Sequence, residues 1–303
     1  MALCYNVNHE CVRTTSSEGA EIAMDGFKET ARKYTEHDLI AAHTELPEFP
    51  ELRSRVFAAF LRYATAKAPH PKLQEAIGLA VSLMQHGLDT HELVDGTGET
   101  RRRQMTVLAG DYFSSRFYQV LSQAESVQTI GLVSQAVCEV NRFKMNMYLK
   151  AKRLLLSAEE YVRATVDINT HLFLTFTSWM EDVYRKSCPA VLRAVAECEL
   201  IEAELTRTRP DNVKDGWAYW YVIENGTPEE VELLVSGRMD ESRLQSVMLK
   251  YNLIGRLTDR LEANVEELRQ LLRGIGSDKL AEELLRLAEP LFAQRTTTRV
   301  QEI

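Results

Sequence analysis

The spacing of apolar residues is the feature that most constrains how this chain can fold. Apolar side chains recur every three to four positions through 52–68 and 73–88, and again through about 104–122 and 126–156. This spacing places them on one face of a helix. No segment shows the sustained two-residue alternation of a half-buried strand. The pattern therefore predicts an all-α bundle of about ten or more helices.

Capping residues mark the beginnings of further helices. A Ser-Ala-Glu-Glu capping box at Ser157 opens a helix that we expect to reach Val183. Thr227 precedes a proline and two acidic residues, the usual order at a helix start. Asp240 can cap one long helix that continues to Leu272.

The same signals divide the chain. A last helix is expected to begin at Ser277 and to end near Pro290, because proline interrupts a helix. We expect a flexible N-terminus over 1–25, a single all-α domain over 26–293 and a flexible C-terminus over 294–303.

Composition narrows the classes of function. The net charge is −8 and basic clusters are short, which argues against a nucleic-acid partner. The five cysteines form no C-x-x-C pair, as is usual for reduced thiols in a cytosolic protein. No signal sequence and no apolar run of ~18 residues is found. We therefore expect a cytoplasmic protein with at most peripheral membrane contact.

An Ala-Gly-Asp-Tyr step interrupts the helix expected at 104–122. Glycine inside a helix costs about 1 kcal/mol relative to alanine, so Gly110 indicates a close helix contact or the approach of another group to the backbone. Asp111 beside it is either a buried, hydrogen-bonded residue or a catalytic one, and the buried role is the commoner.

Two polar clusters surround this step. His91, Glu92 and Asp95 share a helix face and could hold a divalent metal. Asp95 replaces the second histidine of the H-E-x-x-H zinc pattern, so a solvated helix end is strongly favoured over a zinc site. Arg101, Arg102 and Arg103 could bind a diphosphate or a partner's carboxylates, since guanidinium groups match both geometries. Their alternative is a solvated helix start, but three arginines there oppose the helix dipole.

Other segments have plainer interpretations. Glu139, Arg142 and Lys144 are expected to form surface ion pairs, and the aromatic block 217–221 is expected to pack a core or an interface. G-x-S-x-G, P-loop and G-x-G-x-x-G motifs do not occur, so the hydrolase, NTPase and dinucleotide classes have no support.

Taken in order, these pieces resemble the trans-prenyl diphosphate synthases. The resemblance covers roughly 45–290 and includes Val-Leu-Ala-Gly-Asp-Tyr at 107–112 and Val-Ile-Glu-Asn-Gly-Thr-Pro-Glu-Glu at 222–230. It implies an isoprenoid-synthase-like helical bundle. In that family, Mg²⁺ ions held between two aspartate-rich motifs ionise an allylic diphosphate, and Lys and Arg bind the phosphates.

The chain departs from this family where catalysis takes place. The first aspartate motif is reduced to His91, Glu92 and Asp95, and the nearest match to the second is the Ile-Glu-Ala-Glu of 201–204. Asn169-Thr170 stands in place of a Lys-Thr pair, and 66–72 lacks the Gly-Gly-Lys signature for the homoallylic diphosphate. Together these losses should abolish catalysis, so the resemblance implies no catalytic residue and no metal in this chain.

The combination is similar to component I of heptaprenyl diphosphate synthase, the small subunit of a two-subunit enzyme. This resemblance implies a heteromer in which component II carries both aspartate motifs and the Mg²⁺. The complex would extend farnesyl diphosphate with isopentenyl units to heptaprenyl diphosphate, for the menaquinone side chain. The small subunit would be inactive alone, would contact isoprenoid diphosphates only through the complex, and would be needed for activity and product length.

The helix over 101–121 would form much of the surface on which the partner docks. The interface candidates are the large side chains Met105, Tyr112, Phe113, Phe117 and Tyr118. Two alternatives remain open. One is an independently active prenyltransferase or terpene-type synthase that uses His91, Glu92 and Asp95; the other is a helical interaction protein without an isoprenoid role.

Overall fold

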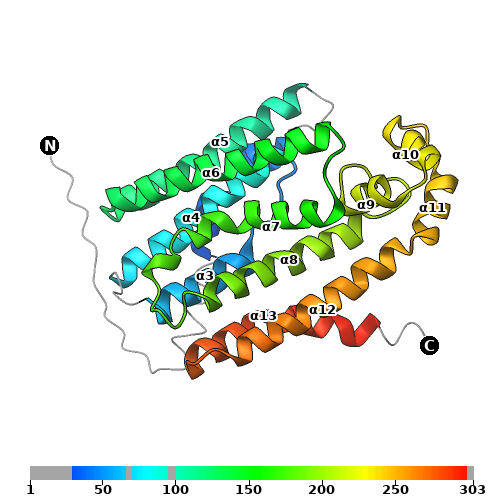
Figure 1. Ribbon diagram of the computed structural model, residues 1–303. Coiled ribbons are helices and arrows are strands. Elements are labelled where there is room, and N and C mark those ends of the chain that lie inside the picture. Colours follow the sequence, from blue (N-terminus) through cyan, green and yellow to red (C-terminus); the bar gives the residue numbers. More distant parts are fainter. Residues whose placement is uncertain (1–28, 66–69, 95–99, 299–303) are drawn as a thin grey trace.

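The computed structural model in Figure 1 describes residues 29–65, 70–94 and 100–298, with side chains as far as residue 293. In these ranges the chain is helical, and its extended pairings are two isolated bridges. The all-α prediction is confirmed. The flexible ends predicted for 1–25 and beyond 298 lie outside the described residues, and the domain limits stay predictions.

A short helical segment at 29–35 precedes the labelled helices. Their bounds are α2 Asp38–His43, α3 Glu51–Tyr63, α4 Pro71–Glu92, α5 Thr100–Gln123, α6 Val127–Lys152, α7 Ala158–Leu174, the 3-10 helix η1 Thr177–Trp179, α8 Ser187–Arg207, α9 Trp217–Asn225, α10 Pro228–Val235, α11 Glu241–Lys250, α12 Leu253–Arg273 and α13 Asp278–Thr298.

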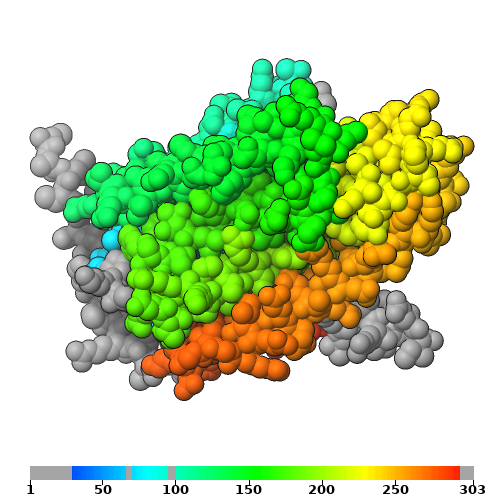
Figure 2. All heavy atoms as spheres, in the orientation of Figure 1, coloured from blue at the N-terminus to red at the C-terminus, as the bar shows by residue number. Residues whose placement is uncertain are grey.

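The helices form successive layers. In Figure 1, α5 and α6 lie along one side, α3, α4, α7 and α8 fill the middle, and α12 and α13 lie on the opposite side. The short helices α9, α10 and α11 gather at one end. Figure 2 shows the same order on the molecular surface.

Two large apolar clusters stabilise this arrangement. The larger one packs the middle layer against α12 and α13, with Phe57 fully buried against Phe173 at a ring distance of 5.4 Å. The second lies beneath α9–α11 and contains Trp217, Tyr219 and Trp220. The aromatic block therefore packs a core, one of the two roles predicted for it.

Two glycines allow α4 and α5 to lie very close together. A Cβ atom on Gly87 would meet the backbone nitrogen of Ser114 at 2.7 Å, and one on Gly110 would meet the His91 ring at 2.6 Å. Neither position has room for alanine without movement of its neighbour. The close contact predicted from the Ala-Gly-Asp-Tyr step is confirmed, and its partner is α4.

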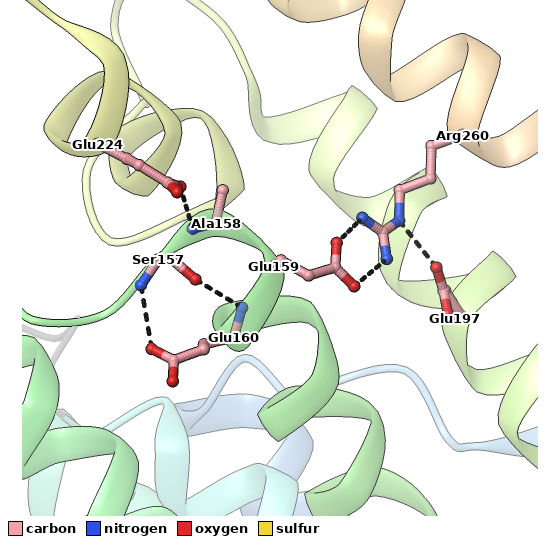
Figure 3. Close-up of polar contacts among 7 residues, drawn as sticks. All are labelled: Ser157, Ala158, Glu159, Glu160, Glu197, Glu224 and Arg260. Atoms are coloured by element: carbon pink, nitrogen blue, oxygen red, sulfur yellow. Dashed lines mark hydrogen bonds and ion pairs between the residues drawn. The ribbon is translucent and has the colours of Figure 1, made fainter.

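The start of α7 is fixed by several polar contacts (Figure 3). The capping box at Ser157 is present in both directions, and Glu224 of α9 accepts the N–H of Ala158 at 3.2 Å. Arg260 of α12 bridges Glu159 of α7 and Glu197 of α8. Its hydrogen bond keeps the pKa of Glu159 below the ordinary value. These contacts connect α7 with three other helices: α8, α9 and α12.

The predicted extent of α7 is wrong. The helix ends at Leu174 instead of continuing to Val183, and the chain turns through η1. After this turn, the N–H of Glu181 donates to the Ala64 oxygen at 2.8 Å, and Met180 forms a bridge with Thr65. This long-range pairing with the end of α3 redirects the chain, although the local apolar spacing is still helical.

The single helix predicted from Asp240 to Leu272 is also wrong, because α11 and α12 are separate. Asn252 between them has a left-handed backbone with φ 49°. Asparagine tolerates this conformation better than most residues. The Thr227 and Asp240 caps are both confirmed.

The expected end near Pro290 is wrong too. Pro290 lies inside α13, which continues to Thr298, so helix occupies the first part of the predicted flexible tail. Leu287 and Leu291 are buried on either side of the proline. Their packing keeps the helical course despite the lost backbone hydrogen bond.

We expect Gly87→Ala to destabilise the isolated chain by about 1–3 kcal/mol, because the new methyl group meets the α5 backbone. The matched control is Gly131→Ala on α6, where an added Cβ has open space within 4 Å. That change should be neutral or stabilising by up to about 1 kcal/mol. Thermal and urea unfolding measure both variants, and equal effects would contradict the close crossing.

Candidate functional site

The residues predicted as a remnant of the first aspartate motif lie at and after the end of α4, and the two described ones, His91 and Glu92, have partners. His91 Nε2 lies 3.4 Å from Asp111 Oδ1 on α5. Glu92 Oε1 lies 2.5 Å from Lys144 Nζ on α6. Asp95 lies outside the described residues.

Asp111 is largely exposed, so the prediction that it is buried is wrong. Its carboxylate faces the His91 ring, which rests on Gly110. Gly110 and Asp111 therefore form the contact surface for the end of α4.

Lys144 fastens this end of α4 to α6. Besides Glu92, its ammonium donates to the Leu88 oxygen at 3.2 Å, one of the last carbonyls of α4. A cation is favourable there because the helix dipole makes this end negative. Arg142 and Glu139 form the surface ion pair predicted for them, whereas Lys144 turns inward.

Sequence reasoning missed the polar residues further inside the bundle. Asp89, one turn before the end of α4, accepts a hydrogen bond from Gln85 Nε2 at 2.8 Å. Burial raises the pKa of Asp89, and the nearby charge of Arg53 opposes that rise. A carboxylate in such a place requires a positive charge close by.

Arg53 supplies that charge. It lies on α3 with only 8% of its surface exposed, and its Nε is 2.5 Å from Glu199 Oε2 on α8. Its Nη1 also donates to the main-chain oxygen of Asn169 at 2.9 Å. Burial raises the pKa of Glu199, and Arg53 counteracts this as well. The Arg53 guanidinium on α3 therefore contacts α7 and α8. Its charge also stabilises the ionised form of Asp89 on α4.

A sequence signal for Arg53 existed. It lies in phase with the buried face of its helix, four residues before Phe57. A charged residue on an apolar face is seldom buried without a partner, so this position could have been singled out.

The second motif remnant is structural. Glu204, only 2% exposed, accepts the Tyr161 hydroxyl and the backbone N–H of Trp217, both at 2.7 Å. Arg207 completes the group. Burial and the Glu204 carboxylate raise the pKa of Tyr161. These bonds hold the start of α9 and occupy both carboxylate oxygens of Glu204.

The described residues do not fit a magnesium site of the aspartate-motif kind. Such a site needs several carboxylate oxygens that converge on one point. Here Glu92 and Glu199 each face a cation, and His91 faces Asp111. In the part of the chain that the structure describes, no three potential ligands gather. At the Asn169-Thr170 position, the Thr170 hydroxyl donates to the Val166 oxygen.

The three arginines at the start of α5 diverge. Arg102 pairs with Glu45, and with Arg101 and Met105 it borders a hollow of about 470 Å³ beside α2. Arg103 borders a second, more apolar hollow of about 550 Å³. They do not form one anion site, and their contact with a diphosphate or a partner stays a prediction.

The interface candidates on α5 separate into two groups. Phe113 is fully buried and packs on the His86 ring at 4.7 Å, and Phe117 is also buried. Their assignment to a docking surface is wrong, because their side of α5 faces the core. Met105 and Tyr112 are partly buried, and Tyr118 is 53% exposed. Only these three stay candidates for outside contact.

The helical arrangement matches that of isoprenyl diphosphate synthases. A geranylgeranyl pyrophosphate synthase from Lactobacillus brevis superposes with a TM-score of 0.69 over 91% of this chain and 97% of that one, at 12% identity. A heptaprenyl diphosphate synthase from Staphylococcus aureus gives 0.65 over 92% and 98%, also at 12% identity. The chain thus has the fold of this class of enzyme.

The sequence comparison identifies the branch of that class. The profile of heptaprenyl diphosphate synthase (HEPPP synthase) subunit 1 matches residues 37–201, and the chain belongs to this family. Component 1 of heptaprenyl diphosphate synthase from Geobacillus stearothermophilus is 38% identical over 81 residues. That alignment covers 26% of this chain and 37% of the Geobacillus protein.

Among the described helices, none is both long and apolar enough to span a bilayer.

Replacing Arg53 by Met should destabilise the chain by about 3 kcal/mol at pH 8, because Glu199 and Asp89 lose their buried counter-charge. A carboxyl whose pKa is raised by folding binds protons more tightly when folded, so stability falls as pH rises above its unfolded pKa of about 4. Without Arg53 both pKa values rise further, and the penalty should be smaller at pH 5.5 than at pH 8.

Unfolding of Arg53→Met and the wild type at the two pH values measures this effect. Arg55→Met is the control, since Arg55 pairs with Glu51 one turn away on the same helix. The assignment of Arg53 as counter-charge is wrong if both variants lose the same stability at both pH values.

Proposed function

We propose that this chain is the accessory subunit of a heteromeric long-chain trans-prenyl diphosphate synthase. It is inactive alone and associates with a catalytic chain that carries both aspartate motifs and the Mg²⁺. The complex joins farnesyl diphosphate with isopentenyl diphosphates to give heptaprenyl diphosphate, the precursor of the menaquinone side chain. The accessory chain is required for activity and for product length.

Internal ion pairs of carboxylates on α4 and α8 carry this proposal. In the synthases, metal and diphosphate need free carboxylates on facing helices. Here Arg53 and Lys144 already neutralise carboxylates on α8 and α4. The chain has the fold of the synthases, but its own cations already pair with these carboxylates. A role in association with another subunit therefore explains the chain better than independent catalysis.

The alternative of an independently active synthase would need His91, Glu92 and Asp95 to bind metal together. His91 and Glu92 face different neighbours, on α5 and α6. The alternative of an unrelated helical interaction protein lacks support from the family match.

A prenyltransferase assay tests the proposal. The purified chain alone, given farnesyl and isopentenyl diphosphates with Mg²⁺, should form no product. Addition of a catalytic chain bearing two D-D-x-x-D motifs should give long-chain product at least about tenfold faster than that chain alone. Product by the isolated chain, or no effect of mixing, would refute an accessory role.

The exposed side of α6 supports a particular docking surface. No charged residue occurs between Val127 and Cys138, although Val127, Gln128, Gln135 and Cys138 are exposed. Solvated helix faces normally carry charges, whereas the centres of protein interfaces are depleted of them. We define the uncharged α6 face as the exposed residues of 127–138. A matching partner surface would be an uncharged helical face of the catalytic subunit.

Gln135→Lys and Val127→Glu should each weaken the complex with the catalytic subunit by about tenfold or more, because a charge would be desolvated in the contact. Both side chains reach solvent in the isolated chain, so its circular dichroism and unfolding should stay unchanged. Leu249→Glu on α11 is the control, at a leucine that is 74% exposed. Titration calorimetry measures the affinity, and equal affinity for all variants would place the contact elsewhere.

A further inference from the structure

The turn between α6 and α7 has an unusual backbone. Leu154, just after the helix, has a left-handed conformation with φ 55°. Its N–H donates to the Ala151 oxygen and the N–H of Leu155 donates to the Lys150 oxygen, both at 2.9 Å. This is the hydrogen-bond pattern of the Schellman motif, in which the left-handed position usually holds glycine.

A leucine is costly in this position. Among the described residues with positive φ, the others are polar or glycine: Glu125, Asp215, Asn252 and Gly237. Leu154 alone is apolar. Burial of apolar surface offsets little of this cost, since Leu154 is 39% exposed and Leu155 is 64% exposed. Outliers of this kind often persist for a function outside the fold.

The exposure is imposed by ordered structure on both sides. Leu156, the next residue, is buried in the second core. Ser157 then caps α7, and Glu224 accepts from Ala158 (Figure 3). Glu160 of the capping box also pairs with Lys150 of α6 at 2.7 Å. The two leucines are therefore held outward by contacts before and after the turn.

Two cations directly precede these leucines in the chain. Lys152 and Arg153 are exposed, and in the described ranges neither has an acidic partner, unlike Lys150. One turn earlier Tyr148 and Leu149 are exposed too. We name the α6–α7 corner by its six residues: Tyr148, Leu149, Lys152, Arg153, Leu154 and Leu155. It lies at the end of the bundle that carries α9–α11 (Figure 1).

We propose that the α6–α7 corner docks the protein on an anionic lipid bilayer. Exposed leucines can enter the boundary between headgroups and acyl chains, while Lys152 and Arg153 meet lipid phosphates. Tyr148 suits the headgroup level. A protein partner fits less well, because interface centres are depleted of lysine. The corner also differs from the uncharged α6 face, which has no such cations.

Sedimentation with vesicles tests this site on the full chain. Vesicles of phosphatidylglycerol and phosphatidylcholine should bind it, and vesicles of phosphatidylcholine alone should bind it weakly. The double variant Leu154→Gly, Leu155→Ser should lower binding by about tenfold or more through lost apolar contact. Its thermal stability should be unchanged or higher, because glycine suits the left-handed backbone. Loss of binding without loss of fold distinguishes docking from a structural role.

The charges are tested separately. Lys152→Gln and Arg153→Gln should each lower binding roughly fivefold at low salt, and wild-type binding should weaken as salt rises. Leu249→Ser is the control, at a leucine on α11 that is 74% exposed and whose loss should leave binding unchanged.

Equal vesicle binding by the corner variants and the wild type would overturn the proposal. So would corner variants that bind vesicles normally but lose affinity for the catalytic subunit, since the corner would then be a protein contact. The proposed function is tested by the prenyltransferase assay and does not depend on either result.

Discussion

The buried guanidinium of Arg53 balances the acidic side chains at the centre of this bundle. Asp89 on α4 and Glu199 on α8 approach each other across the middle layer, and burial raises the pKa of both. Two carboxylates in such a place either take up protons or acquire a cation. Such a cation can be a metal ion or a basic side chain. In this chain, Arg53 on α3 and Lys144 on α6 supply positive charge. Side chains of the bundle itself therefore balance its buried carboxylates.

This internal neutralisation changes the meaning of the Ala-Gly-Asp-Tyr step. In isolation, Gly110 and Asp111 suggest a fragment of an active site. In the structure, Gly110 gives the His91 ring room and Asp111 faces that ring, while Gly87 lets α5 approach one turn further back. The glycines set the distance between α4 and α5. The step belongs to the scaffold, which accounts for its presence in a chain whose aspartate motif has been reduced.

Local signals in the sequence predicted much of the fold. Apolar spacing and the caps at Ser157, Thr227 and Asp240 gave the helices and most of their starts, because both depend on residues within one turn. The end of α7 could not be predicted in this way, since it depends on the pairing of Met180 with Thr65, more than a hundred positions away. The same limit applies to the site: its cation, Arg53, comes from α3, and its partner Glu199 comes from α8. Phe113 and Phe117 show a related difficulty, because an aromatic side chain suits a core and an interface equally well.

Two surface features are unfavourable for the isolated chain, and contact with an external partner would explain them. Leu154 adopts a conformation that glycine would adopt at lower cost, and the α6 face between Val127 and Cys138 lacks the charges that keep helices soluble. Neither feature contributes to the two apolar cores. The two are chemically different, since one is uncharged and the other combines leucines with free cations. A single partner would have to accommodate both, whereas a helical subunit on the α6 face and a lipid surface at the α6–α7 corner each match one. We therefore infer two separate external contacts on α6, one for a protein subunit and one for a lipid surface.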